Sequence, residues 1–462
     1  MMARTGNSIA VGASAPTDKR ALLDRIRDAG LVGMGGAGFP MHVKFDAEVD
    51  TVLANGAECE PLLWTDKQYM LHWPEELIRG LEIAIDTVGA QRGVIGIKGK
   101  YTAVVEAVES AIHARGPGGP PLEVFPMPNF YPAGDEFSLV QQVLGRTIPE
   151  MGLPLHVGVV VSNTATLHHL ARAVLANEPL TSRLVTVCGE VRSPVVVQAP
   201  VGTPMTDLLE AAGGVTRQDV TLVDGGPMMG HLTSVDAAMK KTCSGIVVLP
   251  THQPLVQRKI EGPDAKLRVA RAACCSCQEC TEVCPRNALG HRIYPHRLMQ
   301  SVASGITHDV RAYLGALLCC ECGLCTEYGC PLYLDPCRMN IECKQLLRSQ
   351  GVSYPDPQAS KPSRFFNIKQ VPATRLAARL GLNKYLGEVP MAPEPLRPAR
   401  VELALRQGIG QPCKPVVAVG ERVVVGQLVA EPGGPICAAL HASIDGVVDR
   451  VDETAIVVRR DP

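Results

Sequence analysis

The sequence predicts a multidomain α/β protein that continues into a cysteine-rich helical region and ends in a small β module. Three observations support this fold class. Apolar segments alternate with helical periodicity in the first third of the chain, two cysteine blocks lie between Cys274 and Cys330, and valine strands separated by glycine fill the C-terminal end. At 462 residues the chain can hold three or more domains, and 46% hydrophobic residues can supply several cores.

Composition excludes several classes of function. The net charge of −1 favours neither nucleic acid nor an anionic membrane surface as a partner. We expect no signal peptide and no membrane span, because no apolar run is long enough to cross a bilayer. Five cysteines fall in each block, so ten of the 17 are concentrated there, which is typical of a reducing cytosol and not of a disulfide scaffold. We therefore expect a cytoplasmic protein.

The first domain is predicted over residues 17–180, after a flexible tail at residues 1–16. Thr17 can N-cap a helix whose apolar positions Leu22, Leu23 and Ile26 share one face. Strands are then expected at 51–54, 94–98 and 157–161, and helices at 101–113 and 165–176. This βαβ order indicates an α/β domain, and such domains bind ligands at the carboxyl ends of their strands.

Four segments of this domain carry the candidate ligand-binding residues. A glycine-rich loop at residues 33–39 precedes Lys44, and a glycine backbone can approach a phosphate closely. The loop contains G-x-G-x-x-G, but it follows a helix and not a strand, so it lacks the context of a Rossmann dinucleotide loop. A plain glycine-rich turn is the alternative. The other candidates lie at strand ends and in loops, at residues 55–61, 131–136 and 162–163.

Residues 183–255 predict a small β-grasp domain. Residues 185–191 alternate as a strand does and run into a second strand at 195–198. A short helix at 205–212 follows and is stopped by two glycines. We interpret the glycine-rich stretch 225–230 as a loop that packs on the first domain, in preference to a ligand site.

Two cysteine motifs predict a ferredoxin-like domain at residues 264–350. The first reads C-x2-C-x2-C-x3-C-P and the second C-x2-C-x2-C-x4-C-P, which doubles the bacterial ferredoxin pattern. Three thiolates on a tight loop bind three irons of a cubane, and the fourth cysteine, before the proline, ligates the other cluster. We therefore predict two [4Fe–4S] clusters, one held by Cys274, Cys277, Cys280 and Cys330 and the other by Cys319, Cys322, Cys325 and Cys284.

Zinc sites and disulfides are the alternatives for these cysteines. Zinc prefers two separated C-x2-C pairs, and disulfides need an oxidising compartment, so both fit the doubled motif poorly. Cys275 and Cys320 lie one position off the ligand register and are interpreted as bystanders, although either can in principle replace its neighbour. Cys337 and Cys343 lie outside both motifs and are interpreted as buried core cysteines.

The remaining residues predict a linker and a β module. Residues 351–398 are rich in proline and lack periodicity except at 373–382, which indicates a linker with one short helix. Residues 399–462 carry short valine strands and resemble a lipoyl/biotinyl-type barrel-sandwich hybrid. No lysine stands at the hairpin around Asp445, where such carriers are modified. A swinging-arm carrier is therefore rejected, and an interaction or docking module is left.

The loops of the first domain resemble the flavin and NADH site of the 51-kDa subunit of respiratory complex I and of RnfC electron-transport subunits. In those families an SLBB module follows the flavin domain, as the predicted β-grasp domain does here. Three positions depart from the pattern: Ala57 replaces an aspartate, Ser162 an asparagine, and Asp46 an aromatic residue. The resemblance implies that Gly33, Gly35, Gly36, Gly38 and Lys44 hold the flavin phosphate, that Asn55 and Asn163 hydrogen-bond the flavin, that Phe39, Glu60 and Glu136 border the nicotinamide nucleotide, and that Glu58 belongs to the same cofactor site.

The order of the domains narrows the resemblance. RnfC proteins carry the barrel-sandwich module at the N-terminus, whereas here it is C-terminal. Together with the 131–136 stretch, the x4 spacing before Cys330 and residues 441–448, this order resembles the PduS family, the cobalamin reductases of propanediol-utilisation microcompartments. The implied architecture is a Rossmann-like FMN-binding domain, an SLBB β-grasp domain, an α-helical two-cluster ferredoxin-like domain and a barrel-sandwich hybrid.

The resemblance also implies a function. NADH would donate electrons through FMN and two [4Fe–4S] clusters to cob(III)alamin, then cob(II)alamin, giving cob(I)alamin for coenzyme B12 regeneration inside a bacterial microcompartment. A flavin is needed because NADH gives two electrons together and clusters accept one at a time. An adenosyltransferase and a shell protein are the implied partners. No side chain is expected to act as a covalent catalyst.

Two alternatives remain open. One is an RnfC-like NADH-to-ferredoxin electron-transport subunit. The other is a non-catalytic electron conduit or docking subunit of a microcompartment, which Ala57 and Asp46 keep open. The corrinoid-binding pattern D-x-H-x-x-G is absent from the sequence, which is expected of a reductase that needs to touch only the corrin edge.

Overall fold

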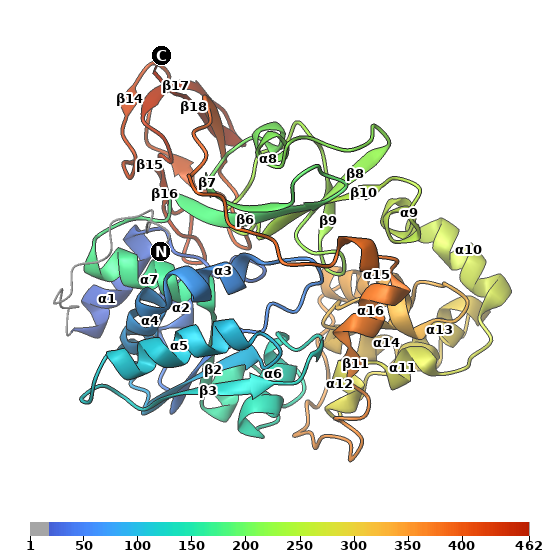
Figure 1. Cartoon of the computed structure of the whole chain (residues 1–462). Helices are drawn as coiled ribbons and strands as arrows, with labels where there is room; N and C mark the ends of the chain where they lie inside the picture. The colour runs from blue at the N-terminus through green and yellow to red at the C-terminus, as the bar shows by residue number, and fades with distance from the viewer. Residues whose placement is uncertain (1–17, 462) are drawn as a thin grey trace.

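The computed structural model describes residues 18–461 and contains the four kinds of domain that the sequence predicts (Figure 1). The predicted tail at residues 1–16 and the predicted N-cap Thr17 lie outside the described residues. In Figure 1 the α/β domain is at the lower left and the ferredoxin-like helices are at the right, with the β-grasp sheet above them and the C-terminal β module at the top. No helix among the described residues combines the length and apolarity needed to cross a membrane.

The first domain is built on a parallel four-stranded sheet in the order β3-β2-β1-β5. Its elements are α1 (Lys19–Asp28), α2 (Met41–Lys44), β1 (Thr51–Gly56), α3 (Thr65–His72), α4 (Pro74–Val88), β2 (Arg92–Lys98), α5 (Thr102–Ala114), β3 (Leu122–Met127), β4 (Phe130–Tyr131), α6 (Glu136–Leu144), η1 (Pro154–Val157), β5 (Val159–Asn163) and α7 (Thr164–Leu175). Helix α1 begins after Asp18, whose carboxylate accepts the N–H of Ala21, and it buries Leu22, Leu23 and Ile26 as predicted. Apolar side chains fill both faces of the sheet, which therefore has cores on its two sides.

The β-grasp domain is a mixed five-stranded sheet in the order β7-β6-β10-β8-β9. Its elements are β6 (Ser182–Gly189), β7 (Val195–Pro200), α8 (Met205–Ala211), β8 (Val220–Asp224), β9 (His231–Thr233) and β10 (Gly245–Pro250). The loop after β8 reaches the first domain, where the N–H groups of Met228 and Met229 donate to the Glu60 carboxylate at 2.9 and 2.8 Å. The glycine-rich stretch 225–230 therefore packs on the first domain, in the way we interpreted it.

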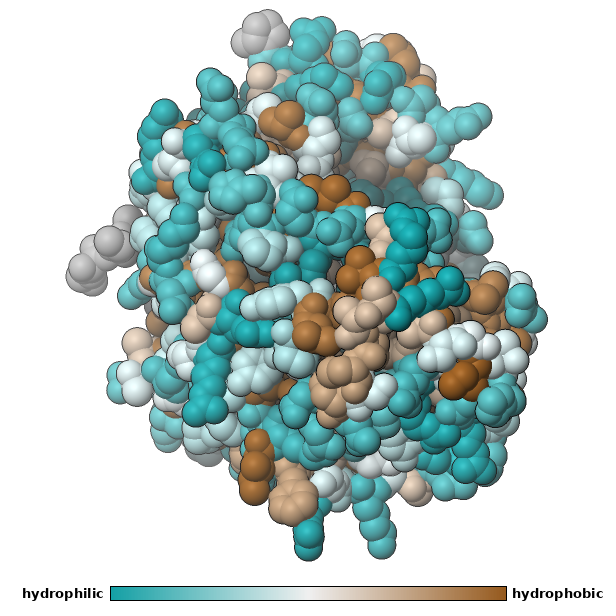
Figure 2. Space-filling model, turned by 90° about the vertical axis from the view of Figure 1, so that its right-hand side faces the viewer, coloured by the Kyte–Doolittle hydropathy of each residue, from teal (hydrophilic) through white to brown (hydrophobic). Residues whose placement is uncertain are grey.

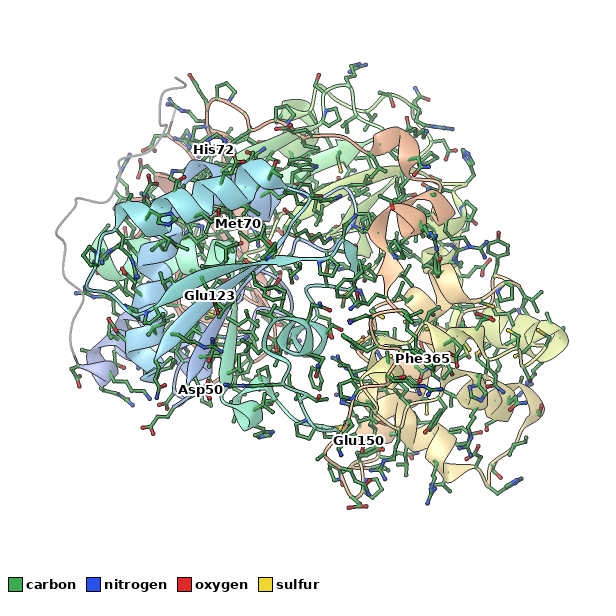
Figure 3. All side chains as sticks on the ribbon, turned by 60° about the horizontal axis from the view of Figure 1, so that its bottom comes forward. Asp50, Met70, His72, Glu123, Glu150 and Phe365 are labelled. Carbon is green, nitrogen blue, oxygen red and sulfur yellow. The ribbon has the colours of Figure 1, made fainter. Side chains whose placement is uncertain are left out.

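Short helices surround the two cysteine motifs. They are α9 (Pro254–Ile260), α10 (Pro263–Ala273), α11 (Glu279–Glu282), α12 (Pro285–Ala288), α13 (Pro295–Ser304), α14 (Val310–Leu314), η2 (Gly315–Leu318), η3 (Cys325–Gly329) and α15 (Pro336–Ser349). Glu150 ties the first domain to this region, because its carboxylate, 1% exposed, accepts hydrogen bonds from Arg292 at 2.6 to 3.0 Å. Figure 3 shows Glu150 at the boundary between the two domains.

Residues 351–398, predicted to be a linker, are in part built into the cores of the other domains. We call residues 371–396 the strap. It contains β11 (Val371–Pro372), α16 (Ala373–Arg379) and η4 (Asn383–Tyr385); β11 pairs with β4, and residues 390–396 hydrogen-bond along β7. Leu376 is fully buried and Val389 is almost so. The linker interpretation is therefore wrong for the strap, because its spaced apolar residues pack on several domains without a repeating period.

The C-terminal β module consists of two sheets, in the orders β12-β18-β17-β14 and β13-β15-β16. Its strands are β12 (Arg400–Ala404), β13 (Lys414–Pro415), β14 (Arg422–Val423), β15 (Leu428–Glu431), β16 (Leu440–His441), β17 (Gly446–Val451) and β18 (Ala455–Arg459). Near its base, Ile409 donates its N–H to the Ala37 carbonyl at 2.9 Å, and Gly408 lies against Gly38. The module therefore contacts the glycine-rich loop of the first domain.

We predict that Leu376→Ala lowers the stability of the whole assembly of domains. Removing this fully buried side chain leaves a cavity in a shared core, which typically costs about 2–5 kcal/mol. Thermal or urea unfolding measures the loss. Leu346→Ala, which truncates an exposed leucine of α15, is the matched control and should melt as the wild type does. Equal melting of the two variants would show that the strap is a linker after all.

Candidate functional site

Asn55 and Asn163 lie side by side at the carboxyl ends of β1 and β5. Asn55 donates from Nδ2 to the Gly134 carbonyl at 2.9 Å, which draws the 131–136 loop to this edge of the sheet. Asn163 caps α7 by accepting the N–H of Ala165 at 3.0 Å, and its Nδ2 donates to Asp66 at 2.8 Å. The parallel register thus brings two loops that are distant in sequence to one edge, where ligands of open α/β sheets bind.

The glycine-rich loop is held on one side and exposed on the other. Gly33 donates its N–H to the Phe39 carbonyl at 2.8 Å, and Met34 donates to Thr166 Oγ1 at 3.0 Å. A Cβ on Gly36 would meet no atom within 4 Å, whereas one on Gly35 would lie 3.0 Å from Asn163 Nδ2. The exposed side leaves room for a phosphate to approach the backbone, as the sequence predicts.

Lys44 and Glu136, predicted to serve different nucleotides, are paired with each other. Lys44 Nζ donates to Glu136 Oε1 at 2.7 Å, and both side chains are partly exposed. An ammonium group has three donors, so this bond leaves Lys44 able to bind a phosphate as well.

Glu58 is buried, Glu60 is partly buried, and both are hydrogen-bonded within the protein. Glu58 accepts the N–H of Lys67 at 3.0 Å, and Glu60 accepts the two N–H groups from the β-grasp loop. Burial raises the pKa of Glu60, and the same effect together with the charge of Glu58 raises the pKa of Asp66 to about 7. That Glu60 borders the nicotinamide nucleotide stays a prediction. In the structure its carboxylate already accepts hydrogen bonds from the β-grasp loop.

A cavity of about 250 Å³ opens beside this edge of the sheet, and sequence analysis missed it. Its charged lining comprises Lys67, Lys98 and Lys100 together with Glu58 and Glu60, and residues 373–387 of the strap line it as well. Lys98 could have been noticed, because it ends a predicted strand and so lies where such sheets bind ligands. No sequence feature predicted that the strap would line this cavity, since residues 351–398 were interpreted as a linker.

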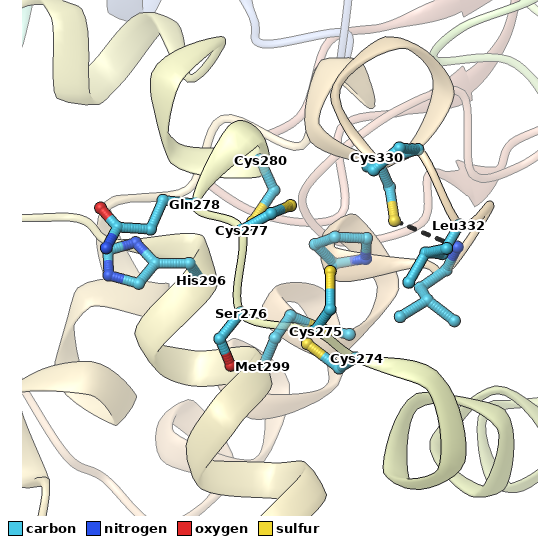
Figure 4. A pocket seen from close by; sticks show the side chains of 13 residues that line it. Cys274, Cys275, Ser276, Cys277, Gln278, Cys280, His296, Met299, Cys330 and Leu332 are labelled. Carbon is cyan, nitrogen blue, oxygen red and sulfur yellow. Dashed lines mark hydrogen bonds between the residues drawn. The ribbon is translucent and has the colours of Figure 1, made fainter.

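The first cysteine pocket combines both motifs (Figure 4). Cys274, Cys277, Cys280 and Cys330 all line it, together with His296 and Met299. The N–H of Leu334 lies 3.3 Å from Cys330 Sγ, in a contact of the kind that stabilises a thiolate. Cys275 lines the same pocket but is exposed to solvent.

The second cysteine pocket is lined by Cys284, Cys319, Cys322 and Cys325. The side chains therefore gather in the two crossed groups that the motif spacing predicts. Cys337 lines this pocket as well, and its thiol contacts Cys319 and Cys325. It is buried as interpreted, but it is not a core residue remote from the clusters, because α15 begins at Pro336 and turns Cys337 inward.

The donor set of both pockets fits a cubane cluster. The first pocket is lined by five cysteines, the four predicted ligands and Cys275, and the second by six, the four predicted ligands with Cys320 and Cys337. Neither pocket is lined by a lysine or a carboxylate. Within residues 18–461 no three His, Cys, Asp or Glu side chains lie close enough to hold a single metal ion. Cubane ligands bind four separate irons, so their sulfurs stand farther apart than the ligands of one ion.

Asn55 and Asn163, at the carboxyl ends of β1 and β5, mark the edge of the sheet predicted to bind the flavin, which we call the flavin edge. The 131–136 loop at this edge touches the second cysteine pocket directly. Tyr131 donates its hydroxyl hydrogen to the Cys322 carbonyl at 2.8 Å. Arg286, two residues after Cys284, donates to both carboxylate oxygens of Asp135 at 2.6 and 2.8 Å. The guanidinium of Arg286 also lies 3.7 Å from the ring centroid of Phe137. The 131–136 loop thus serves the candidate flavin site and the candidate cluster at once.

Comparison with known proteins identifies the family. Four stretches match domain families described as Nuo51 FMN-binding domain (residues 26–172), SLBB domain (184–231), 4Fe-4S dicluster domain (273–335) and RnfC Barrel sandwich hybrid domain (387–461). Cobalamin reductase PduS of Salmonella typhimurium is 42% identical over 439 residues, which cover 95% of this chain and 96% of that protein. The chain belongs to the PduS family. The matched domains confirm the predicted fold class of this PduS-family chain. They also confirm the prediction that its cofactors are FMN and iron–sulfur clusters.

Two further similarities are less extensive. A component of the Na(+)-translocating ferredoxin:NAD(+) oxidoreductase complex of Acetobacterium woodii is 34% identical to this PduS-family chain over 274 residues, 58% of each protein. A solved structure of a NAD+-reducing [NiFe]-hydrogenase in the H2-reduced state aligns with a TM-score of 0.50 at 21% identity. That alignment covers 74% of this chain and 64% of the hydrogenase chain, and it shows the fold alone.

We predict that Cys284→Ser damages the cluster of the second motif. Cys284 belongs to the first motif in sequence but lines the second pocket. Iron analysis and electron paramagnetic resonance of anaerobically isolated protein distinguish the two clusters. Cys275→Ser, at an exposed cysteine of the first motif, should keep both signals. Loss of the first-motif signal in Cys284→Ser would contradict the crossed assignment.

We predict that Lys44→Ala weakens the retention of FMN, because a cation beside a phosphate strengthens its hydrogen bonding. The FMN content per chain after gel filtration measures this. The matched variant Glu136→Gln removes the partner of Lys44 and leaves the ammonium, so it should retain FMN. A Lys44→Ala protein with a full complement of FMN would remove Lys44 from the site.

Proposed function

We propose that this protein is an NADH-dependent cobalamin reductase that works through bound FMN and two [4Fe–4S] clusters. The observation that carries the proposal is the direct contact between the predicted flavin edge and the second cysteine pocket, made by Tyr131 with Cys322 and by Asp135 with Arg286. A relative that is similar over nearly its full length is named cobalamin reductase, and this name supports cobalamin as the acceptor.

A bound flavin supplies the conversion between hydride transfer, which moves two electrons together, and the single-electron chemistry of clusters and cobalt. The residues of this chain hold the two regions at a fixed separation. Tyr131 and Arg286 join the flavin edge to the second pocket, while Glu150 and Arg292 clamp the same two domains farther away. Fixed spacing matters because the rate of electron tunnelling falls steeply with distance.

The order of the pockets supports a direction for the electrons. The second pocket adjoins the flavin edge, and the first lies farther out, with Cys275 and Cys277 exposed. Leu332, which lines the first pocket, and its neighbour Tyr333 are exposed as well. Figure 2 shows the side of the molecule on which the ferredoxin-like domain lies, where hydrophobic side chains gather near the middle of a hydrophilic surface. An acceptor that docks on this side would be reduced from the first cluster without a covalent catalyst.

The proposed reaction fits a wider setting. Cob(I)alamin is the form that an adenosyltransferase uses, so we propose such an enzyme as the partner that consumes the product. The family name supports a place inside a bacterial microcompartment, where a shell protein would be a second partner. The C-terminal β module carries exposed valines, among them Val419 and Val424, and is the part we propose for docking.

We predict that the anaerobic wild-type protein, replete in FMN and iron, oxidises NADH and reduces hydroxocobalamin without a membrane fraction. Cys277→Ala should abolish or strongly slow corrinoid reduction, because it removes a ligand proposed for the outer cluster. It should still allow NADH to bleach the flavin absorbance. A mutant that reduces cobalamin at the wild-type rate would place the clusters outside the route.

Two other outcomes would favour the alternatives. If NADH bleaches the flavin absorbance and the protein reduces ferredoxin but never corrinoid, the RnfC-like electron-transport subunit is favoured. Failure of replete protein to bleach with NADH would favour a non-catalytic conduit, for which the replacement of an aspartate by Ala57 and the engagement of Glu60 are the supporting observations.

A further inference from the structure

We propose that Cys337, which stands outside both cysteine motifs, donates an S–H hydrogen bond to ligand sulfurs of the second pocket and thereby raises the reduction potential of the cluster there. The inference rests on the proposed function, which places a [4Fe–4S] cluster in this pocket. Because the second pocket adjoins the flavin edge, its potential decides how readily the flavin gives up an electron. Cys337 thus tunes the route without ligating iron.

Cys337 contacts predicted ligands of both clusters. It lines the second pocket, and its thiol hydrogen-bonds with those of Cys319 and Cys325. It is also packed with Cys280, a predicted ligand of the first cluster, in a buried group of side chains that includes Cys325. Only 7% of Cys337 is exposed, so its thiol faces these sulfurs and little water.

Cluster binding leaves Cys337 as the hydrogen donor among these sulfurs. Cysteines bind metal as thiolates, which have lost their hydrogens, so Cys319 and Cys325 can then only accept hydrogen bonds. Cys337 is outside the predicted ligand set and keeps its hydrogen. The backbone N–H of Glu321 also donates to Cys319 Sγ, at 3.3 Å, and the other extra cysteine of the pocket, Cys320, contacts Cys322 instead. Cys337 therefore adds a side-chain donor that comes from a different segment of the chain.

A hydrogen-bond network fixes Cys337 at the start of α15. Its N–H donates to Thr326 Oγ1 at 3.0 Å, and the Thr326 hydroxyl donates to Asp335 Oδ1 at 2.7 Å. Asp335 also accepts the N–H of Arg338 at 2.9 Å and so caps the helix. Thr326 directly follows Cys325 in the second motif. The network therefore ties the motif to the helix that carries Cys337, which holds the thiol beside its acceptors.

Burial makes such a donor effective. Cys284, Cys322 and Cys325 of the second pocket are buried, whereas Cys275 and Cys277 of the first are exposed. Reduction adds negative charge to a cluster, and a buried site screens that charge poorly. A hydrogen bond to a ligand sulfur stabilises the reduced form more than the oxidised form and so raises the potential. Cys337 therefore offsets part of the cost that burial imposes on reduction of the second cluster.

A redox titration followed by electron paramagnetic resonance tests the inference on anaerobically isolated protein. The signal that Cys284→Ser loses identifies the second cluster. In Cys337→Ala the ratio of reduced to oxidised second cluster at a given potential should fall about fivefold, the effect of losing one hydrogen bond, which lowers its midpoint potential by about 40 mV. Cys337→Ser keeps a hydrogen donor at this position and should titrate close to the wild type.

Cys343→Ala is the matched control. Cys343 belongs to the same helix, but its thiol donates to the Tyr313 carbonyl at 3.6 Å and it lines neither cysteine pocket, so this variant should keep the wild-type potentials. The inference is overturned if Cys337→Ala keeps the wild-type potential, or if the folded variant loses the second cluster. Should the alanine variant not fold, Cys337→Ser decides alone. A hydroxyl donates more strongly than a thiol, so a midpoint potential below that of the wild type would contradict the assignment.

These measurements need neither NADH nor cobalamin. A protein that shows the expected shift in potential but never reduces corrinoid would therefore refute the proposed acceptor and leave the role of Cys337 standing. A protein that reduces corrinoid while Cys337→Ala keeps the wild-type potential would refute the role of Cys337 alone.

Discussion

One shared core holds the redox domains of this protein at fixed positions. Leu376 of the strap is buried with Leu62 of the first domain, Leu249 of the β-grasp domain and Leu324 of the second cysteine motif in a single hydrophobic cluster. Three domains therefore depend on the same buried apolar surface, and none can shift without exposing it. Electron transfer needs such rigidity, because the separation of the redox centres has to stay constant between one turnover and the next.

Polar contacts determine which surfaces meet around that core. Arg286 with Asp135, and Arg292 with Glu150, join the ferredoxin-like domain to the first domain. Lys241 of the β-grasp domain, fully buried, donates to the carbonyls of Gly30 and Ala439, in the first domain and the C-terminal module. A buried charge without its partner is strongly destabilising, so these pairs penalise any other arrangement of the domains. The apolar core thus supplies the cohesion, and the buried charges give the interfaces their specificity.

The strap changes how the ligand-binding edge of the first domain is understood. The sequence divides this part of the chain into an α/β domain with ligand loops and a remote linker. In the structure the predicted linker forms one wall of the cavity that Lys98 and Lys100 line. The strap covers this edge of the sheet, and burial lowers the pKa of Lys98 to about 8. The cavity therefore belongs to the assembled chain and not to one domain.

The sequence alone determined what depends on local spacing. The pattern of apolar residues predicted β1, β2 and β5 and the helices α1, α5 and α7, but not α3, α4 or α6. The doubled cysteine motif predicted that Cys284 and Cys330 would exchange pockets, and their side chains line the pockets in that arrangement. Tertiary structure decided everything that depends on packing between distant segments. The pairing of Lys44 with Glu136, the engagement of Glu60 by the β-grasp loop, the place of Cys337 in the second pocket and the burial of Leu376 leave no periodic trace. The periodicity of apolar residues indicates which side of a single helix or strand is buried. The contacts named above arise instead where two or three folded segments pack together and bury surfaces that each segment alone leaves exposed.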